Sequence, residues 1–228
     1  MKIKNELLTA SQILFENRAD AGRQLASALQ AYSNQKTVVL AIPNGGVPLA
    51  IPVAEALQAE LDIIICRKLA LPMNQAGGLG AVADDGTSII NQDVVERDGI
   101  SQAQVEHELN EVKANIKQRS ALYKGEGVSP RMTGKTVILV DDGLASGITM
   151  TVAVEAVRHR RPKQIIVAIP LASQTGYNRV SKVADAVVVC AVANLSRFYL
   201  ADFYRVWRDI SDSEVALALK QWRQRQII

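Results

Sequence analysis

Short apolar runs alternate with amphipathic stretches along most of the chain. Five runs are rich in β-branched residues and continuously apolar: 38–42, 63–66, 136–140, 165–169 and 186–190. Continuous apolar sequence is typical of strands that are covered on both faces. Helical patterns lie between most of these runs, including a long charged one over 102–123 and another over 149–158. This alternation predicts an α/β fold with a doubly wound, mainly parallel, five-stranded sheet.

One stretch, residues 69–98, interrupts this rhythm after the second predicted strand. It contains Pro72, Gly77, Gly78, Gly80 and Gly86 around two short apolar runs. Glycine and proline at such density favour turns over helices or long strands. We therefore expect a flexible loop with a hairpin, and loops of this length in compact domains are usually functional.

The C-terminal segment, residues 195–228, is unusually aromatic. It holds Phe198, Tyr199, Phe203, Tyr204, Trp207 and Trp222, which are six of the ten aromatic residues of the chain. If the segment is helical, the spacing of Tyr199, Phe203 and Trp207 places them on one ridge. We interpret the segment as a small hood over a ligand site or as an interface, carried by a single domain spanning 1–228.

Composition limits the classes of partner. Apolar residues make up 48% of the chain, and 26 basic against 23 acidic residues give a net charge of only +3. These values fit a folded globular protein. The small net charge argues neither for nor against nucleic acid, because such binding surfaces are usually clustered, and the nearest basic cluster, 158–161, is interpreted as a solvated helix end. No apolar run approaches the roughly 20 residues that span a bilayer, and the N-terminus lacks a signal-peptide pattern. Cys66 and Cys190 are expected as buried free thiols, which fits a reducing compartment, so we expect a cytoplasmic protein. We expect neither nucleic-acid nor membrane partners.

The segment 137–149 carries the clearest chemistry. Its four apolar residues predict a buried strand, and two adjacent carboxylates, Asp141 and Asp142, follow that strand. The loop and first helical turn after them comprise Gly143, Leu144, Ala145, Ser146, Gly147, Ile148 and Thr149. Ligands bind at the carboxyl ends of such strands, and backbone amides at a helix N-terminus bind phosphate. Gly143 and Gly147 permit the close approach that this binding requires.

The two carboxylates call for a different partner from the loop. They would repel a phosphate, but each can accept two hydrogen bonds from vicinal hydroxyl groups such as those of a ribose. Phosphate on the loop and ribose on Asp141 and Asp142 together describe a ribose 5-phosphate.

This segment resembles the thirteen-residue binding motif for phosphoribosyl pyrophosphate (PRPP) in type I phosphoribosyltransferases. The resemblance implies that fold, with residues 143–149 on the 5-phosphate of PRPP. It implies an enzyme that transfers the 5-phosphoribosyl group to a nitrogen acceptor, expected to be a nucleobase, and releases pyrophosphate. It further implies Mg²⁺ as cofactor, held indirectly by Asp141 and Asp142 through ribose hydroxyls or water, and a homodimer.

Two further segments fit the same resemblance. Asn44, Gly45 and Gly46 follow the first strand, where the family holds pyrophosphate, although Arg often stands in place of Asn44. Arg67 and Lys68 follow the second strand and would balance the negative charges of PRPP. With Asp141 and Asp142, this basic pair forms the implied catalytic set.

A second class of function stays open. A protein that senses PRPP or a nucleotide without turnover would keep the motif, and Asn44 favours it because one positive charge is missing. A dinucleotide oxidoreductase would need Gly-x-Gly-x-x-Gly in the first turn, which residues 43–48 lack.

The acceptor itself is not encoded in the donor motif, because specificity lies in the hood and loops. We expect at least one ring of Tyr199, Phe203, Tyr204 and Trp207 within about 10 Å of the Asp141 and Asp142 carboxylates, a span that fits a ribose and a stacked base.

Overall fold

The computed structural model describes residues 6–33, 35–70, 78–124 and 129–225. Six strands of this described part form one sheet in the order β1-β9-β8-β7-β2-β3, and every pair in it is parallel. The strands are β1 (Glu6–Leu8), β2 (Thr37–Ala41), β3 (Glu60–Ile63), β7 (Thr136–Val140), β8 (Gln164–Ser173) and β9 (Ala186–Ala193). The predicted α/β class is confirmed. The sheet has one strand more than predicted, because β1 has only three residues and gave no recognisable apolar run.

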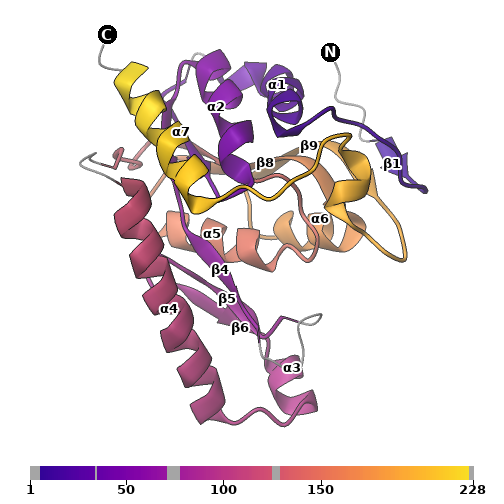
Figure 1. Cartoon of the computed structure of the whole chain (residues 1–228), viewed down its shortest axis with the longest axis vertical. Coiled ribbons are helices and arrows are strands. Elements are labelled where there is room, and N and C mark those ends of the chain that lie inside the picture. Colours follow the sequence, from indigo (N-terminus) through magenta and orange to yellow (C-terminus); the bar gives the residue numbers. More distant parts are fainter. Residues whose placement is uncertain (1–5, 34, 71–77, 125–128, 226–228) are drawn as a thin grey trace.

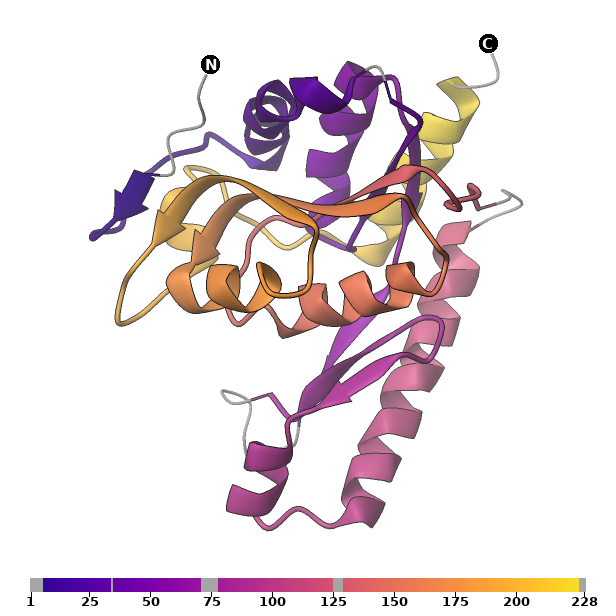
Figure 2. The ribbon, with the colours of Figure 1, turned by 180° about the vertical axis from the view of Figure 1, so that it is seen from behind.

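Helices cover both faces of this sheet (Figures 1 and 2). One face carries α1 (Arg18–Ala28), followed by the short 3-10 turn η1 (Gln30–Tyr32), together with α2 (Gly46–Leu57) and α7 (Asp212–Arg225). The other face carries α5 (Ile148–Arg158) and α6 (Gln174–Val180). Successive strand residues alternate between the two hydrophobic cores, as Ile138 and Leu139 do. Both faces are therefore buried, which is why the strands read as continuous apolar runs.

The second predicted strand, 63–66, is divided between two sheets. Strand β3 ends at Ile63, and the chain then leaves the main sheet to form β4 (Cys66–Leu69). Strands β4, β5 (Gly80–Ala83) and β6 (Ser88–Ile90) form a separate three-stranded antiparallel sheet. The hairpin expected within 69–98 is the pair β5–β6, while Pro72 and Gly77 lie outside the described residues.

This small sheet is packed between two helices. Helix α5 contacts one of its faces, and the long helix α4 (Gln102–Lys124) contacts the other (Figure 2). The short helix α3 (Gln92–Arg97) connects β6 to α4. The small sheet therefore extends away from the carboxyl end of the main sheet, and α4 braces it along its length.

The aromatic ridge predicted for the C-terminal segment is wrong. Only a 3-10 turn, η2 (Leu200–Phe203), forms between β9 and α7, and the flanking chain is not helical. Tyr199 is 62% exposed, whereas Phe203 is completely buried. The spacing of four residues therefore does not place these side chains on one face.

Cys66 and Cys190 are both free thiols, the first buried and the second half-buried. Burial raises the pKa of the Cys190 thiol to about 11. Within the described ranges, no helix combines the length and apolarity that crossing a bilayer requires.

Candidate functional site

Two loops meet at the carboxyl end of the main sheet. One connects β7 to α5, and the other connects the neighbouring strand β2 to α2. A β-carbon at Gly45 would overlap the Asp142 carboxylate, and one at Gly46 would lie 2.6 Å from the carbonyl oxygen of Val140. Only glycine at positions 45 and 46 allows the β2–α2 loop to approach the end of β7 this closely. The two loops that the sequence singled out are therefore in contact.

The β7–α5 loop has an anion-binding geometry. Gly147 adopts a positive φ of 76°, and a β-carbon there would lie 3.0 Å from the carbonyl oxygen of Gly176. In the described part of the chain, the backbone amides of Ala145, Ser146, Gly147 and Thr149 have no hydrogen-bond acceptor. Unpaired amides at a helix N-terminus form a ready site for a phosphate group.

The loop is also held rigidly from behind. The Leu144 amide donates to the carbonyl of Leu171 at 2.9 Å, and the Leu144 carbonyl accepts from the Ser173 amide at 2.8 Å. Arg179 donates to the carbonyl of Ser146 at 2.9 Å. The carbonyl groups are thus tied to β8 and α6, which leaves the amides to face a ligand.

The two carboxylates of the motif have different surroundings. Asp142 Oδ2 accepts a hydrogen bond from Arg18 Nε at 2.8 Å, in a largely buried ion pair. Asp141 accepts only the backbone amide of Asp142, at 2.9 Å, among the residues that the structure describes. Burial and the charge of Asp142 raise the pKa of Asp141. Burial also raises the pKa of Asp142, but its ion pair with Arg18 opposes the rise. Asp141 is therefore the carboxylate with unused acceptor capacity.

Sequence reasoning missed Arg18. It opens helix α1, and it also donates to the carbonyl of Arg208 at 2.7 Å. Its guanidinium carbon lies 3.8 Å from the centre of the Trp207 ring, which is a cation–π contact. One signal was available: a cation in the first turn is unfavourable for the helix dipole, so an arginine there suggests a partner elsewhere.

The C-terminal segment covers this side of the motif. The Tyr204 hydroxyl donates to the backbone carbonyl of Asp142 at 2.7 Å, and the Leu200 side chain occupies the space that a β-carbon at Gly143 would need. Trp207 stacks on the guanidinium that binds Asp142, so its ring is within the expected distance of about 10 Å of that carboxylate. The predicted closeness of an aromatic ring is confirmed.

The side chain of Asn44 points into the protein. Its Nδ2 donates to the carbonyl of Ile210 at 2.7 Å and to Asp212 Oδ1 at 2.9 Å. Its Oδ1 accepts from Arg119 at 3.0 Å and from the Tyr123 hydroxyl at 3.1 Å. The Pro43–Asn44 peptide bond is cis. In the described ranges the backbone amides of Asn44 and Gly45 have no acceptor, so this loop can offer only its backbone to an anion.

Arg67 and Lys68 lie on opposite faces of β4, as neighbours on a strand must. Burial and the charge of Arg119 lower the pKa of Arg67, whereas Asp212 opposes this change. Lys68 instead influences the Asp141 carboxylate, because its positive charge opposes the rise in the pKa of Asp141. The two basic residues therefore serve different places: Arg67 lies near the residues that contact the Asn44 side chain, and Lys68 acts on Asp141.

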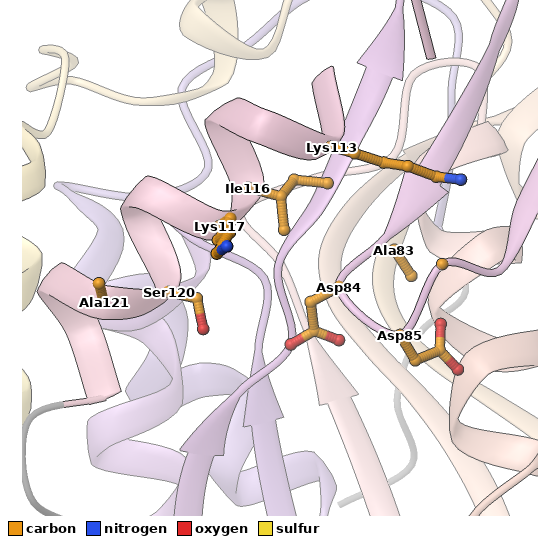
Figure 3. A pocket seen from close by; sticks show the side chains of 9 residues that line it. Ala83, Asp84, Asp85, Lys113, Ile116, Lys117, Ser120 and Ala121 are labelled. Atoms are coloured by element: carbon orange, nitrogen blue, oxygen red, sulfur yellow. The ribbon is translucent and has the colours of Figure 1, made fainter. Parts of the chain in front are cut away.

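A separate pocket of about 560 Å³ lies between α4 and the turn that joins β5 to β6 (Figure 3). Lys113, Lys117 and Ser120 line it from α4, across from Asp84 and Asp85. Asp84 is paired with Arg160, and Asp85 with His159. None of the site residues expected from the sequence lines this pocket.

Residues 9–201 match the family model described as the phosphoribosyl transferase domain. The chain belongs to this family. A Mycobacterium tuberculosis protein, provisionally named as a phosphoribosyl transferase, is 34% identical over 206 residues, which are 90% of this chain and 46% of the relative. The chain thus spans about half the length of the curated relatives it matches.

Solved structures agree with this assignment. The crystal structure of a Thermus thermophilus protein has a TM-score of 0.76 at 31% identity, covering 91% of this chain and 98% of the other. An Aquifex aeolicus protein has a TM-score of 0.51 at 14% identity, covering 88% and 86%, which shows a shared fold alone. The family model and the curated relative confirm the resemblance to phosphoribosyltransferases, a pentosyltransferase family, and the solved structures show a shared fold.

Proposed function

We propose that the protein binds PRPP and transfers its 5-phosphoribosyl group to a nitrogen acceptor, a nucleobase, with release of pyrophosphate. The observation that carries this proposal combines two features of the described residues. The backbone amides of Ala145, Ser146, Gly147 and Thr149 have no acceptor, and the neighbouring Asp141 carboxylate accepts only the Asp142 amide. The amides suit the 5-phosphate, and the carboxylate suits the vicinal hydroxyls of the ribose.

In this proposal the two acids of the motif have separate tasks. Asp141 accepts hydrogen bonds from the ribose hydroxyls and favours the positive charge that develops on the ring in an oxocarbenium-like transition state. Asp142 is held by Arg18 and lies against Gly45, so it fixes the distance between the two loops. The raised pKa of Asp141 falls again when cations and hydroxyl donors surround it.

The pyrophosphate would lie on the amides of Asn44 and Gly45, with Arg67 and Lys68 as nearby cations. During transfer the bond between the anomeric carbon and pyrophosphate breaks, a bond to the acceptor nitrogen forms, and the acceptor loses one proton. The protein contributes position and electrostatics, since these motifs contain no evident nucleophile.

The donor set fits magnesium as an ion that arrives with PRPP. Among the described residues, no group of three or more His, Cys, Asp or Glu side chains could hold a metal. Mg²⁺ retains several waters and binds substrate phosphates with one or two carboxylates, so Asp141 would contact it through water or ribose hydroxyls. Bound there, the ion would neutralise the leaving pyrophosphate.

The acceptor would lie under the C-terminal hood. Tyr199 is exposed and directly precedes Leu200, which contacts Gly143 of the motif. A base that stacks on one aromatic ring gains about 1–3 kcal/mol, enough for a useful acceptor affinity. We therefore propose Tyr199 as the stacking residue. Trp207 supports Asp142 through Arg18 and is already stacked on one side.

The test is release of pyrophosphate from PRPP and Mg²⁺ in the presence of single nucleobases, preceded by a thermal-shift screen of PRPP, bases and amines. Turnover with one base, lost in Asp141→Asn and retained in Glu16→Gln, is expected. The control, Glu16, forms an exposed pair with Arg205. Binding of PRPP with no pyrophosphate release for any base would instead support a sensor, the alternative that Asn44 favours.

Two further proposals concern the whole protein. We propose a homodimer, because among the described residues β1 pairs only with β9, so its outer edge is open, and Leu7 on it is 55% exposed. Light scattering after size-exclusion chromatography tests this, with a monomer mass as the contrary result. We also propose a cytoplasmic location, which cell fractionation tests.

A further inference from the structure

The family position that often carries arginine is Asn44 in this chain, and four polar side chains from three segments meet there. We call this group the Asn44 cluster: Asn44, Arg119, Tyr123 and Asp212. Arg119 and Tyr123 come from α4, and Asp212 opens α7. The Tyr123 hydroxyl shares its one proton between Asn44 Oδ1 and Asp212 Oδ1, with the shorter distance, 2.7 Å, to Asp212. Arg119 lies 3.3 Å from the same carboxylate. The cluster therefore links the β2–α2 loop to two helices that are distant in sequence.

The cluster carries an excess of positive charge. Arg119 is paired with Asp212, and Arg67 on β4 is close enough for the charges of both to shift its pKa. Two guanidinium groups thus lie near a single carboxylate. The Arg119 and Asp212 side chains are only 18% and 33% exposed, so water screens this charge incompletely. Like charges held together in a partly buried place are stabilised by an anion, and the free amides of Asn44 and Gly45 are beside them.

Arg119 also has donors to spare. A guanidinium group has five N–H donors, and its contacts with Asn44, Tyr123 and Asp212 account for at most three of them. The Asn44 side chain is bonded on both its nitrogen and its oxygen, so it holds Arg119 in place.

We propose that Arg119 supplies, together with Arg67, the cationic side of the pyrophosphate subsite, the charge that the β2–α2 loop itself lacks. Asn44 positions Arg119 and is not itself a ligand. The inference rests on the proposed function, and it names residues that make turnover compatible with asparagine at this position.

The experiment measures affinity by isothermal titration with three probes: ribose 5-phosphate, inorganic pyrophosphate with Mg²⁺, and PRPP with Mg²⁺. Arg119→Met is expected to weaken pyrophosphate and PRPP about tenfold to hundredfold, the loss typical of one or two hydrogen bonds to a charged group. Ribose 5-phosphate lacks the pyrophosphate and should bind within about twofold of the wild type. Arg119→Lys keeps the charge but loses the planar fork, so a smaller loss is expected.

Arg223→Met is the matched control. Arg223 also ties α7 to α4, by donating to the backbone carbonyl of Tyr123 at 2.9 Å, but it makes no contact with Asn44. Its loss should leave all three affinities unchanged. Equal weakening of pyrophosphate in both variants would show that Arg119 acts only through helix packing and would overturn the proposal.

Other outcomes are equally decisive. Unchanged pyrophosphate affinity in Arg119→Met, or in Arg119→Lys should the first variant not fold, would also overturn the proposal, as would a wild type that binds no pyrophosphate. A wild type that binds pyrophosphate but neither PRPP nor ribose 5-phosphate would remove the proposed function and leave Arg119 as part of a simple anion site.

Discussion

The two loops at the carboxyl ends of β7 and β2 prepare for an anion in opposite ways. The β7–α5 loop exposes backbone amides and ties its carbonyl groups to β8 and α6. The β2–α2 loop turns its one polar side chain, Asn44, inward and has charged groups brought beside it by α4 and β4. The backbone site on the β7–α5 loop is formed by consecutive residues. The site on the β2–α2 loop depends on Arg119, which is 75 positions from Asn44.

The largest expected effect is at the backbone site. Gly147→Ala places a β-carbon against Gly176 and Leu144 at a positive φ, so the loop must shift its amides. Losing about two charge-assisted hydrogen bonds should weaken ribose 5-phosphate and PRPP alike by about a thousandfold. Titration calorimetry with both ligands checks this.

Gly134→Ala is its control, because Gly134 has nearly the same φ of 73° with open space around it. Both variants should lose about 1–2 kcal/mol of folding stability from the strained backbone. Only Gly147→Ala should also lose affinity for ribose 5-phosphate and PRPP. A loss confined to PRPP would place the pyrophosphate, and not the 5-phosphate, on this loop.

Next in size is Asp142, where the two loops touch. Asp142→Asn leaves the buried Arg18 guanidinium without a counter-charge, so the free energy of unfolding should fall by about 3 kcal/mol. Glu16→Gln removes the partner of exposed Arg205 and should cost under about 1 kcal/mol. Urea denaturation measures the free energy of unfolding of both variants. Equally small losses in the two would show that the Arg18–Asp142 pair does not stabilise the fold.

Asn44→Asp sharpens the account of the other loop. The change is nearly isosteric, but it replaces two donated hydrogen bonds with repulsion toward Asp212 and the Ile210 carbonyl. The new carboxylate also attracts Arg119, but that guanidinium already has Asp212 as its partner, so the loss is expected to outweigh the gain. A stability loss of about 2 kcal/mol is expected. The control Asn178→Asp, on exposed α6, should change stability by less than about 0.5 kcal/mol. A wild-type melting curve for Asn44→Asp would contradict the cluster.

The smallest effect concerns Asp141 and pH. Its folded-state pKa is raised by burial and by Asp142, so its contribution is favourable at low pH and is lost as pH rises through that pKa. Asp141→Asn should therefore melt higher than the wild type at neutral pH. The difference should vanish near pH 3, where the carboxyl group is protonated in both states. A lower melting temperature for Asp141→Asn than for the wild type at neutral pH would show that the ionised Asp141 carboxylate stabilises the fold, against this prediction.

The sequence predicted the parts of this protein that depend on local pattern. Runs such as 136–140 predicted a sheet covered on both faces, and the glycines at 143 and 147 predicted a loop with close backbone approach, which the structure has. Phosphate binding on that loop stays a proposal. It did not predict that Arg18 pairs with Asp142, 124 positions away, because side-chain pairing across a fold leaves no periodic trace. The aromatic spacing at 199–207 misled for a related reason: packing around Phe15 and Asp142, and not helix propensity, sets that segment's path.

The contact between Leu200 and Gly143 restricts how this protein can diversify. The leucine fits because position 143 has no side chain, so the two positions can change only together. Tyr199, one residue earlier, faces solvent and is free of that constraint. Exchange of the hood between relatives must therefore preserve the leucine–glycine pair. The stacking role proposed for Tyr199 predicts that a library at position 199 alone alters acceptor preference and leaves PRPP affinity unchanged.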